Sequence, residues 1–380
     1  MQLSGDRILT THAGSLPRPD DLTQLMYNVI DGRFVDEAAL AARVRTAVAE
    51  VVAHQIDVGI DVISDGEMGK VGFAQYVSQR YSGFSGTGRM MPGDLVDVPG
   101  LTASLFAESE GMHHFRLPVL NGPMESRDPG AIDAEIADFL EALGDRSRDG
   151  AFISSVSPGQ VTFNFLNRFY PSHRAYIEAA AEALRPEYEA IVAAGVNLQL
   201  DSPELAMAYH CQLEGGDLTD PRAHAETAIE ALNGALESLP PERLRLHVCW
   251  GNYRGPHHKD VDLRDILEPI LKTRAKFISV EAANPRHEHE WDVWRDVKLP
   301  DDKALIVGVI DTKTNHVEHP RLIAQRLERF ASLVGKERVI AGTDCGFATS
   351  VGVHTCHPEV AWMKLAALAV GAQLASENLW

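Results

Sequence analysis

The stretch LRLHVCWGNY, residues 244–253, places a histidine and a cysteine two residues apart at the end of an apolar run. The run alternates and has the length of a β-strand, so the side chains of His247 and Cys249 should point to the same side. Both residue types are also common in cores, because unpaired cysteine is among the most often buried residues. By itself the pair therefore indicates either a metal site or an ordinary core.

Similar residues follow other apolar runs of the chain. Six runs end in carboxylates, histidine or cysteine, namely Asp65 and Glu67, Asp201 and Glu204, His247 and Cys249, Glu281, Asp311, and Asp344 and Cys345. Charged groups are costly in a core, so one such ending could be chance but six favour a site. We therefore expect these side chains to meet at one place in the fold.

The elements that must position them alternate along the chain. β-rich runs begin at residues 7, 61, 117, 151, 196, 243, 276, 304 and 338, and segments such as 38–56 and 175–195 between them have helical periodicity. Alternating strands and helices over 380 residues predict one α/β domain, residues 1–380, a (β/α)₈ TIM barrel with long loops at its C-terminal mouth. Nine runs exceed eight strands, so we assign 117–121 to a hairpin outside the barrel.

Two long loops interrupt this pattern, at 79–115 and 251–262, and loops of that length are usually lids or binding loops. Three histidine-rich segments are candidates for metal sites by composition alone: MHH at 112–114, PHHK at 256–259 and RHEHE at 286–290. None has strand or helix spacing behind it, so we predict that all three are solvated loops.

Composition narrows the function. A net charge of −19 argues against nucleic acid as a partner, because binding nucleic acid needs a basic face. No segment has the apolar length of a membrane span, and the first residues lack the apolar region of a signal peptide. Four sparse cysteines do not form a disulfide framework and fit a cytoplasmic, reducing location. The partners expected are small molecules, and the oligomeric state stays open, a homo-oligomer included.

In this context the soft ligands indicate zinc. Histidine and two cysteines are ligands that zinc prefers, and a carboxylate can complete a tetrahedron. We predict that zinc is held from three strands by His247, Cys249, Glu281 and Cys345. A catalytic zinc must expose one position, so one ligand, in the first place Glu281, is expected to be displaced by substrate. Cys356 is a weaker candidate ligand because it lies eleven residues past Cys345, and Cys211 is expected in the core because it follows a helix-like stretch.

The segments HVC, SVE and TDCG together resemble the catalytic half of cobalamin-independent methionine synthase and its short single-barrel paralogues. The resemblance runs from THAGSLPRP through DGE and LDSPE to DCGF. It implies a (β/α)₈ barrel with the same four zinc ligands. It also implies an S-alkyl, in the first place methyl, transferase that activates a small thiol such as homocysteine as a zinc thiolate. By motif, Ser15, Glu67 and Asp201, with the backbone of Ala13, correspond to the homocysteine pocket.

Two departures from the family bear on the alkyl donor. The segment SPGQVTFNF, residues 157–165, lacks the tryptophan that stacks on the folate ring, and DTK stands where the family has DIH. Asp311 and Lys313 are thus the candidate catalytic residues, expected to share a face and to pair. A paired lysine is a weak acid, so methyl-folate is in doubt as the donor.

Several alternatives stay open at this point. The anionic tail of a folate would need local cations, for which Arg18 and Lys70 are candidates, although both could equally lie on the solvated surface. Glu67 and Asp201 could be helix caps, although Asp65 and Ser202 are better placed for capping. Other functions are a lyase resembling epoxyalkane:coenzyme M transferase, a metal-free barrel resembling uroporphyrinogen decarboxylase, or a non-catalytic zinc protein.

Overall fold

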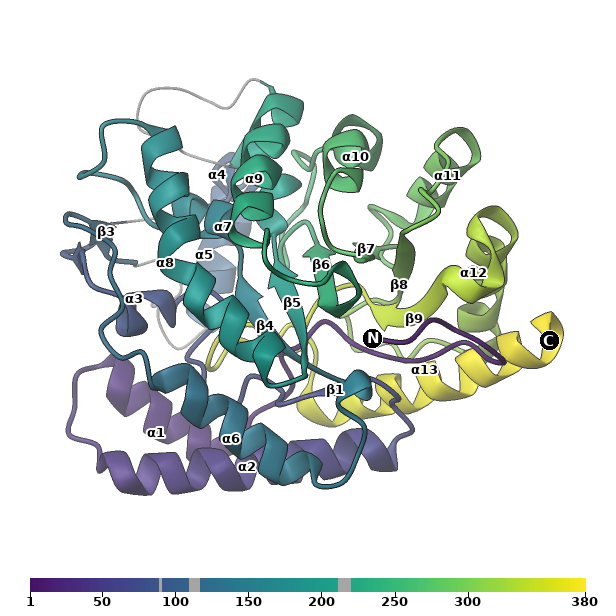
Figure 1. Cartoon of the computed structure of the whole chain (residues 1–380), viewed down its shortest axis with the longest axis horizontal. Coiled ribbons are helices and arrows are strands. Elements are labelled where there is room, and N and C mark those ends of the chain that lie inside the picture. The colour runs from purple at the N-terminus through teal and green to yellow at the C-terminus, as the bar shows by residue number, and fades with distance from the viewer. Residues whose placement is uncertain (89–90, 109–116, 211–219) are drawn as a thin grey trace.

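Parallel strands form one curved sheet in the computed structural model, which describes residues 1–88, 91–108, 117–210 and 220–380 (Figure 1). Within these residues the sheet has seven strands, in the order β1-β4-β5-β6-β7-β8-β9. Their bounds are β1 Ile63–Ser64, β4 Ala151–Val156, β5 Asn197–Asp201, β6 Leu244–Val248, β7 Phe277–Glu281, β8 Ala304–Ile310 and β9 Val339–Thr343. All their residues are buried, as expected for a parallel sheet covered by helices.

An eighth segment closes the sheet into a barrel. The backbone of Thr11 and Leu9 bonds Ala341 of β9, and on the other side the N–H of Val62 bonds the carbonyl of Thr10 next to β1. The run that begins at residue 7 therefore lies between the first and last strands. The predicted (β/α)₈ barrel is confirmed.

Helices connect successive strands and pack on the outside of the sheet (Figure 1). Several begin at a residue whose side chain accepts a backbone N–H, such as Asp36 before α2 and Asp220 before α9. Within the described ranges, none is both long and apolar enough to cross a bilayer. Their bounds are α1 Asp20–Ile30, α2 Glu37–Asp57, α6 Ala131–Leu143, α7 Pro158–Asn164, α8 His173–Ala193, α9 Pro221–Ala235, α10 Leu263–Leu271, α11 Val293–Asp296, α12 Pro320–Val334 and α13 Pro358–Leu379.

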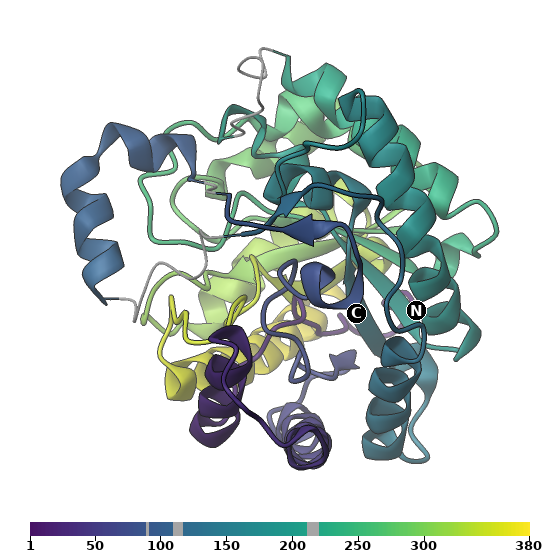
Figure 2. The same ribbon diagram turned by 90° about the vertical axis from the view of Figure 1, so that its left-hand side faces the viewer.

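The long segment between β1 and α6 forms structure outside the barrel. It contains α3 Val77–Arg80, β2 Phe84–Ser85, α4 Gly93–Asp97, α5 Pro99–Glu108 and β3 Val119–Leu120. Strands β2 and β3 pair antiparallel in a separate sheet, as predicted for residues 117–121. Figure 2 shows α4 and α5 as the blue helices at the left, outside the ring of helices around the sheet.

The barrel interior changes from apolar to polar toward the strand ends. One end holds an apolar cluster that includes Phe152 and Phe277. The guanidinium of Arg245 stacks on the Phe152 ring at 3.8 Å and donates to Thr11 Oγ1 and to the carbonyl of His12. Because side chains alternate along β6, Arg245 faces the same side as the residues two and four positions later. The strand therefore delivers His247 and Cys249 to the C-terminal mouth.

Candidate metal centre and substrate cavity

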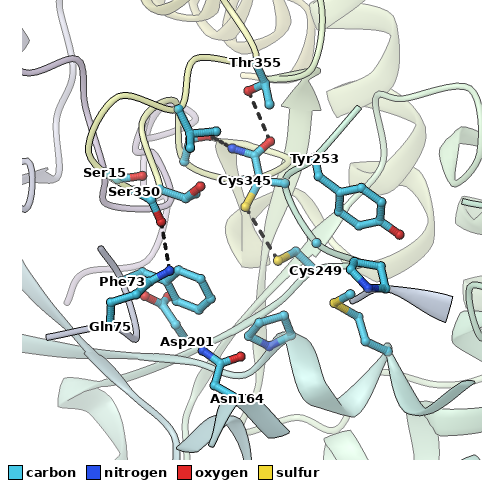
Figure 3. A pocket seen from close by; sticks show the side chains of 18 of the residues that line it. Ser15, Phe73, Gln75, Asn164, Asp201, Cys249, Tyr253, Cys345, Ser350 and Thr355 are labelled. Carbon is cyan, nitrogen blue, oxygen red and sulfur yellow. Dashed lines mark hydrogen bonds between the residues drawn. The ribbon is translucent and has the colours of Figure 1, made fainter. Parts of the chain in front are cut away.

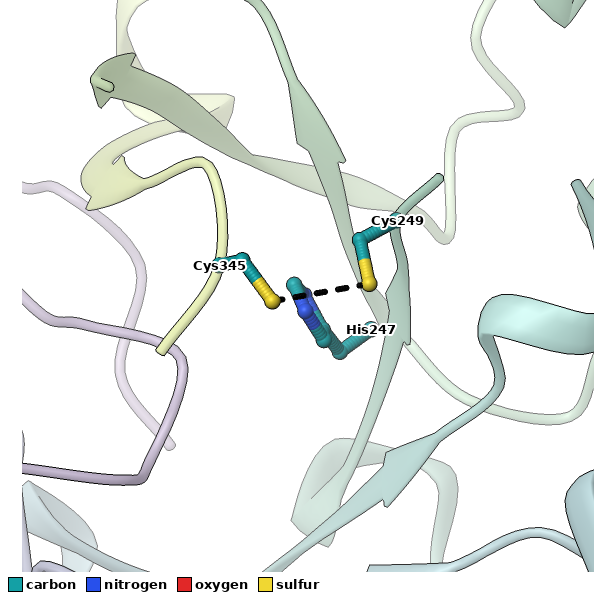
Figure 4. A group of neighbouring side chains, drawn as sticks. All are labelled: His247, Cys249 and Cys345. Carbon is teal, nitrogen blue, oxygen red and sulfur yellow. Dashed lines mark hydrogen bonds between the residues drawn. The ribbon is translucent and has the colours of Figure 1, made fainter. Parts of the chain in front are cut away.

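Three buried side chains converge at the mouth. One ligand atom each from His247, Cys249 and Cys345 lies within 4.8 Å of the others, and in Figure 4 the three side chains point toward one another. The two Sγ atoms are 3.6 Å apart. His247 lies on β6, Cys249 directly follows β6, and Cys345 follows β9, so the barrel brings together residues almost 100 positions apart.

The imidazole of His247 is oriented by one nitrogen and open at the other. Its Nδ1 lies 3.3 Å from the hydroxyl of Ser279 on the neighbouring strand β7. Its Nε2 is buried and has no hydrogen-bond partner among the described residues. A buried polar atom without a partner is costly, so Nε2 is free to bind an incoming group. Hydrogen bonding at the far nitrogen is the usual way to orient a metal-binding histidine.

The other candidate ligands are placed differently. Glu281 ends β7 but is outside the group of three, and its Oε2 accepts from Lys313 Nζ at 3.0 Å. Cys356 is buried, and its Sγ lies 3.6 Å from the carbonyl of His357 rather than in the group. Cys211 lies outside the described residues.

The structure corrects the expected ion pair between Asp311 and Lys313. Asp311 Oδ1 accepts the backbone N–H of Lys313, while the Lys313 ammonium reaches Glu281. The expectation assumed strand alternation, but β8 ends at Ile310, and the chain turns directly after it. The turn carries Lys313 toward the neighbouring strand β7, so the two side chains do not pair.

A cavity of about 340 Å³ opens beside the three converging residues and is lined by all of them (Figure 3). Ser15, Glu67 and Asp201 also line it. So does Ala13, whose backbone was expected to form part of the substrate pocket. The rest of the lining mixes apolar side chains with polar ones, among them Asn164, Arg254 and His354. Its apolar members are Phe73, Pro92, Leu95, Leu105, Leu117, Phe163, Pro203, Met207 and Val353.

Two buried carboxylates face this cavity. Glu67 Oε1 accepts from the Ser154 hydroxyl at 2.7 Å, while Oε2 has no partner among the described residues. Asp201 Oδ1 accepts from the Gln199 amide at 2.9 Å. Burial raises the pKa of Glu67 and raises that of Asp201 to about 7. Burial therefore outweighs the nearby positive charges of Lys70 and Arg18 at Glu67 and of His247 at Asp201.

The capping alternative for these two acids does not match the contacts. Neither carboxylate accepts a backbone N–H in the hydrogen bonds of the described residues, whereas Asp65 Oδ1 accepts the N–H of Glu67 at 3.1 Å. Ser202, the other expected cap, makes no capping bond with its hydroxyl. Glu67 and Asp201 are thus left free for the cavity.

Arg18 and Lys70 are neither local cations for a ligand nor surface residues. Arg18 is buried and donates to the carbonyls of Ala348, Glu67 and Lys70. Lys70 is buried and pairs with Glu135 at 3.0 Å. Both expectations for these residues were wrong, because carbonyls of the segments after β1 and β9 hold Arg18, while Lys70 is held by Glu135 of α6 and the carbonyl of Ser154 of β4.

The prediction of solvated histidine-rich loops was also wrong for His257 and His287, which are buried, although His258 and His289 of the same segments are exposed. Asp260, fully buried at its side chain, accepts from His210 Nε2, His257 Nδ1 and His287 Nε2 at 2.9–3.0 Å. Asp94 of α4 accepts from Tyr253, which lines the cavity. The third segment, 112–114, lies outside the described residues. In the sequence, the signal for this cluster was that histidines and aspartates occur together in loops that flank the mouth of the barrel.

Comparison with known proteins gives a consistent picture. Residues 8–91 and 167–368 match the family model described as the catalytic domain of cobalamin-independent synthase. The methionine synthase of Sulfurisphaera tokodaii is 25% identical over 97% of this chain and 93% of its own length. The 2-hydroxypropyl-CoM lyase of Xanthobacter autotrophicus is 25% identical over 82% of this chain and 81% of its own. A B12-independent methionine synthase from Shewanella sp. W3-18-1, solved with selenomethionine, shares the fold with a TM-score of 0.74 at 19% identity, over 98% of this chain and 99% of that one.

Proposed function

Because the chain belongs to the cobalamin-independent methionine synthase family, we propose that it is a zinc-dependent methyltransferase whose acceptor is a small amino thiol such as homocysteine. One observation carries the proposal: a group of soft donors and an unpartnered carboxylate oxygen open on the same cavity. Relatives named methionine synthase and 5-methyltetrahydropteroyltriglutamate–homocysteine methyltransferase support the reaction class.

The donor group fits zinc. An imidazole nitrogen without a partner and two sulfur atoms 3.6 Å apart are the ligand types that zinc prefers. His247, Cys249 and Cys345 would hold the ion, with Ser279 fixing the imidazole so that Nε2 is the ligand atom. When bound, zinc would lower the pKa of the acceptor thiol so that it is ionised at neutral pH.

The two cavity carboxylates would bind the amino group of the acceptor. A substrate ammonium placed between Glu67 and Asp201 would add positive charge beside two carboxylates whose pKa values burial raises. Glu67 Oε2 has no other partner among the described residues, so it would gain a charged hydrogen bond. Ser15, which lines the same cavity, is the third proposed substrate-binding residue.

The donor side of the site lacks a ready general acid. Asp311 and Lys313 occupy the segment where the family has its histidine, but the Lys313 ammonium is engaged with Glu281. An ammonium in an ion pair is poorly matched to protonating a leaving group near neutral pH. We therefore propose a donor whose leaving group needs little protonation, such as a sulfonium or an activated ether.

The match to a 2-hydroxypropyl-CoM lyase makes thiol addition the second candidate function. The thiol acceptor in such a reaction would be coenzyme M, which has a sulfonate and no amino group. The two buried carboxylates favour an ammonium over a sulfonate beside them, although Arg254 also lines the cavity. The identity of the thiol therefore separates the two functions.

The test is a titration of cobalt-substituted protein with homocysteine, 4-mercaptobutyrate and coenzyme M, followed by the cobalt absorption bands. Homocysteine should change the spectrum at the lowest concentration. Glu67→Gln should weaken homocysteine by about 1.5–3 kcal/mol, or roughly 10- to 150-fold, and barely alter 4-mercaptobutyrate, which lacks the amine. The matched control is Glu204→Gln, because Glu204 is also buried but does not line the cavity.

Two results would count against this assignment. Equal losses for homocysteine and 4-mercaptobutyrate in Glu67→Gln would mean that the carboxylate does not bind an amine. Tighter binding of coenzyme M than of homocysteine by the wild type would favour the lyase.

A further inference from the structure

The carboxylate of Glu281 is fully engaged without a metal. Its Oε1 accepts the backbone N–H of Trp250 at 3.1 Å, and its Oε2 accepts from the Asn284 amide at 2.6 Å and from Lys313 Nζ at 3.0 Å. The side chain of Glu281 is completely buried. A buried carboxylate needs such partners, and here three donors from three different segments supply them.

The surroundings hold these donors in place. Asp344 accepts the backbone N–H groups of Ala282, Ala283 and Asn284 at 2.9–3.0 Å and also the Asn284 side chain at 2.8 Å. The turn after β7 is therefore fixed from β9, and with it the amide that holds Glu281. Glu281 therefore cannot move to a metal ion without breaking its hydrogen bonds to Asn284 and Lys313.

The three remaining candidate ligands differ from Glu281, because their ligand atoms converge on one another. His247 Nε2 has no partner among the described residues, and the ligand atoms of His247, Cys249 and Cys345 already lie within 4.8 Å of one another. Glu281 does not belong to that group. The candidate ligands thus divide into three that converge on one another and one, Glu281, that already has the ammonium of Lys313.

We propose that Lys313 is a positioning residue that keeps Glu281 from coordinating the metal. The resident ligands are then His247, Cys249 and Cys345, and one position is open to the acceptor thiol. This inference rests on the proposed zinc-dependent function. It gives the lysine of the DTK segment a role at the metal centre, beside the lack of a general acid on the donor side.

The charges at the centre explain what the pairing of Lys313 with Glu281 achieves. Two cysteine thiolates balance the charge of a divalent ion, and Lys313 balances Glu281 at 3.0 Å. The carboxylate of Glu281 then does not add to the repulsion of an anionic thiol. A glutamate ligand would add one negative charge and occupy the position that the acceptor needs.

The experiment measures zinc affinity by competition with a chromogenic chelator, together with the cobalt absorption spectrum. Glu281→Gln should weaken zinc by less than about 100-fold, the upper end of the range for a residue outside the ligand set. Lys313→Met should free Glu281 to coordinate and so tighten zinc binding by about tenfold or more, with altered cobalt bands. The double variant Glu281→Gln/Lys313→Met should lose that gain, and Lys313→Arg, which keeps the cation, should resemble the wild type. Thermal denaturation checks that each variant is folded.

Failure of this inference can be told apart from failure of the proposed function. If the wild type binds zinc but Glu281→Gln loses it as fully as Cys249→Ser does, Glu281 is a resident ligand and the inference is overturned. An unchanged affinity and spectrum in folded Lys313→Met would also overturn it. Failure of the wild type to bind zinc at all would instead remove the proposed function, and this inference with it.

Discussion

The thiols of Cys249 and Cys345 are buried, and their Sγ atoms are 3.6 Å apart. Burial alone would raise the pKa of each thiol and so disfavour the thiolate. The hydrogen bond between them lowers the pKa of the Cys345 thiol, and the neighbouring imidazole of His247 adds to the effect. One member of the pair is therefore prepared to lose its proton. A metal site needs this property, because its cysteine ligands bind as thiolates.

At the scale of single residues, we predict that Cys249→Ser and Cys345→Ser each weaken zinc binding by more than about 100-fold, beyond the effect of losing a residue outside the ligand set. The fold should persist, because a barrel with a core of this size does not depend on a metal. Zinc content after dialysis against a chelator, with melting temperature as the check on folding, measures both effects.

Cys356→Ser is the matched control for these variants, since Cys356 is buried but outside the converging group. It should keep the zinc content of the wild type. Full zinc content in both Cys249→Ser and Cys345→Ser would show that the metal, if any, binds elsewhere.

At the scale of elements, a buried charged cluster joins the loops around the mouth. Asp260 follows the 251–258 turn, and it accepts from histidines of two other segments, one of which includes His287. The His287 ring also stacks on Trp250 at 3.9 Å and bonds Glu290 at 3.0 Å. Loops that looked solvated in the sequence are therefore braced by ionic contacts, which keeps the cavity wall in place.

This cluster predicts a pH dependence of stability. Burial opposes the charge on His287, but hydrogen bonds to Asp260 and Glu290 and the nearby charge of Glu281 raise its pKa from 6.5 to about 9. A raised pKa stabilises the folded state below the unfolded value of 6.5, and this contribution is lost as the pH rises through about 9. The difference in melting temperature between wild type and His287→Gln should be largest near pH 6 and should shrink by about pH 10.

A remainder that does not depend on pH is expected, because the substitution also removes the stacking on Trp250. His258→Gln serves as the control, since His258 is exposed and pairs only with Asp97 at the surface. A gap that stays constant across this pH range would mean that His287 is uncharged in the folded protein.

At the scale of the whole molecule, charge and cavity size both bear on the alkyl donor. The chain has a net charge of −19, and the cavity of about 340 Å³ is at the lower end of the range for ligand sites. Arg18 and Lys70, the two cations expected to bind an anionic tail, are committed to internal contacts, and Arg254 is the basic residue in the cavity lining besides the histidines. Residues 157–165 contribute Gln160, Phe163 and Asn164 to the cavity and no tryptophan for stacking on a folate ring.

We therefore predict slow or no turnover with methyl-folate and faster turnover with a sulfonium or activated ether. Single-turnover methylation of homocysteine by each donor, in zinc-loaded protein, measures this. Methyl-folate reacting at an ordinary enzymatic rate of about 1 per second or more would show that another residue, with His316 as the first candidate, supplies the acid.

The sequence by itself determined the barrel and the mouth at which the chemistry-bearing residues gather. Strand periodicity is local, and in a closed parallel barrel all strand ends of one polarity meet at one rim. Polar endings such as His247, Cys249 and Cys345 could therefore be placed near one another without coordinates. The pairing of residues 117–121 outside the barrel followed from the same count of strands.

Only the tertiary structure decided which of these residues contact each other. Lys313 pairs with Glu281 rather than with Asp311, because alternation no longer holds once β8 ends. Asp260 gathers histidines from segments up to 50 residues away, and no local pattern encodes such contacts. Side-chain direction beyond a strand end depends on the turn and on the elements packed against it, so the ligand set and the ion pairs required the folded chain.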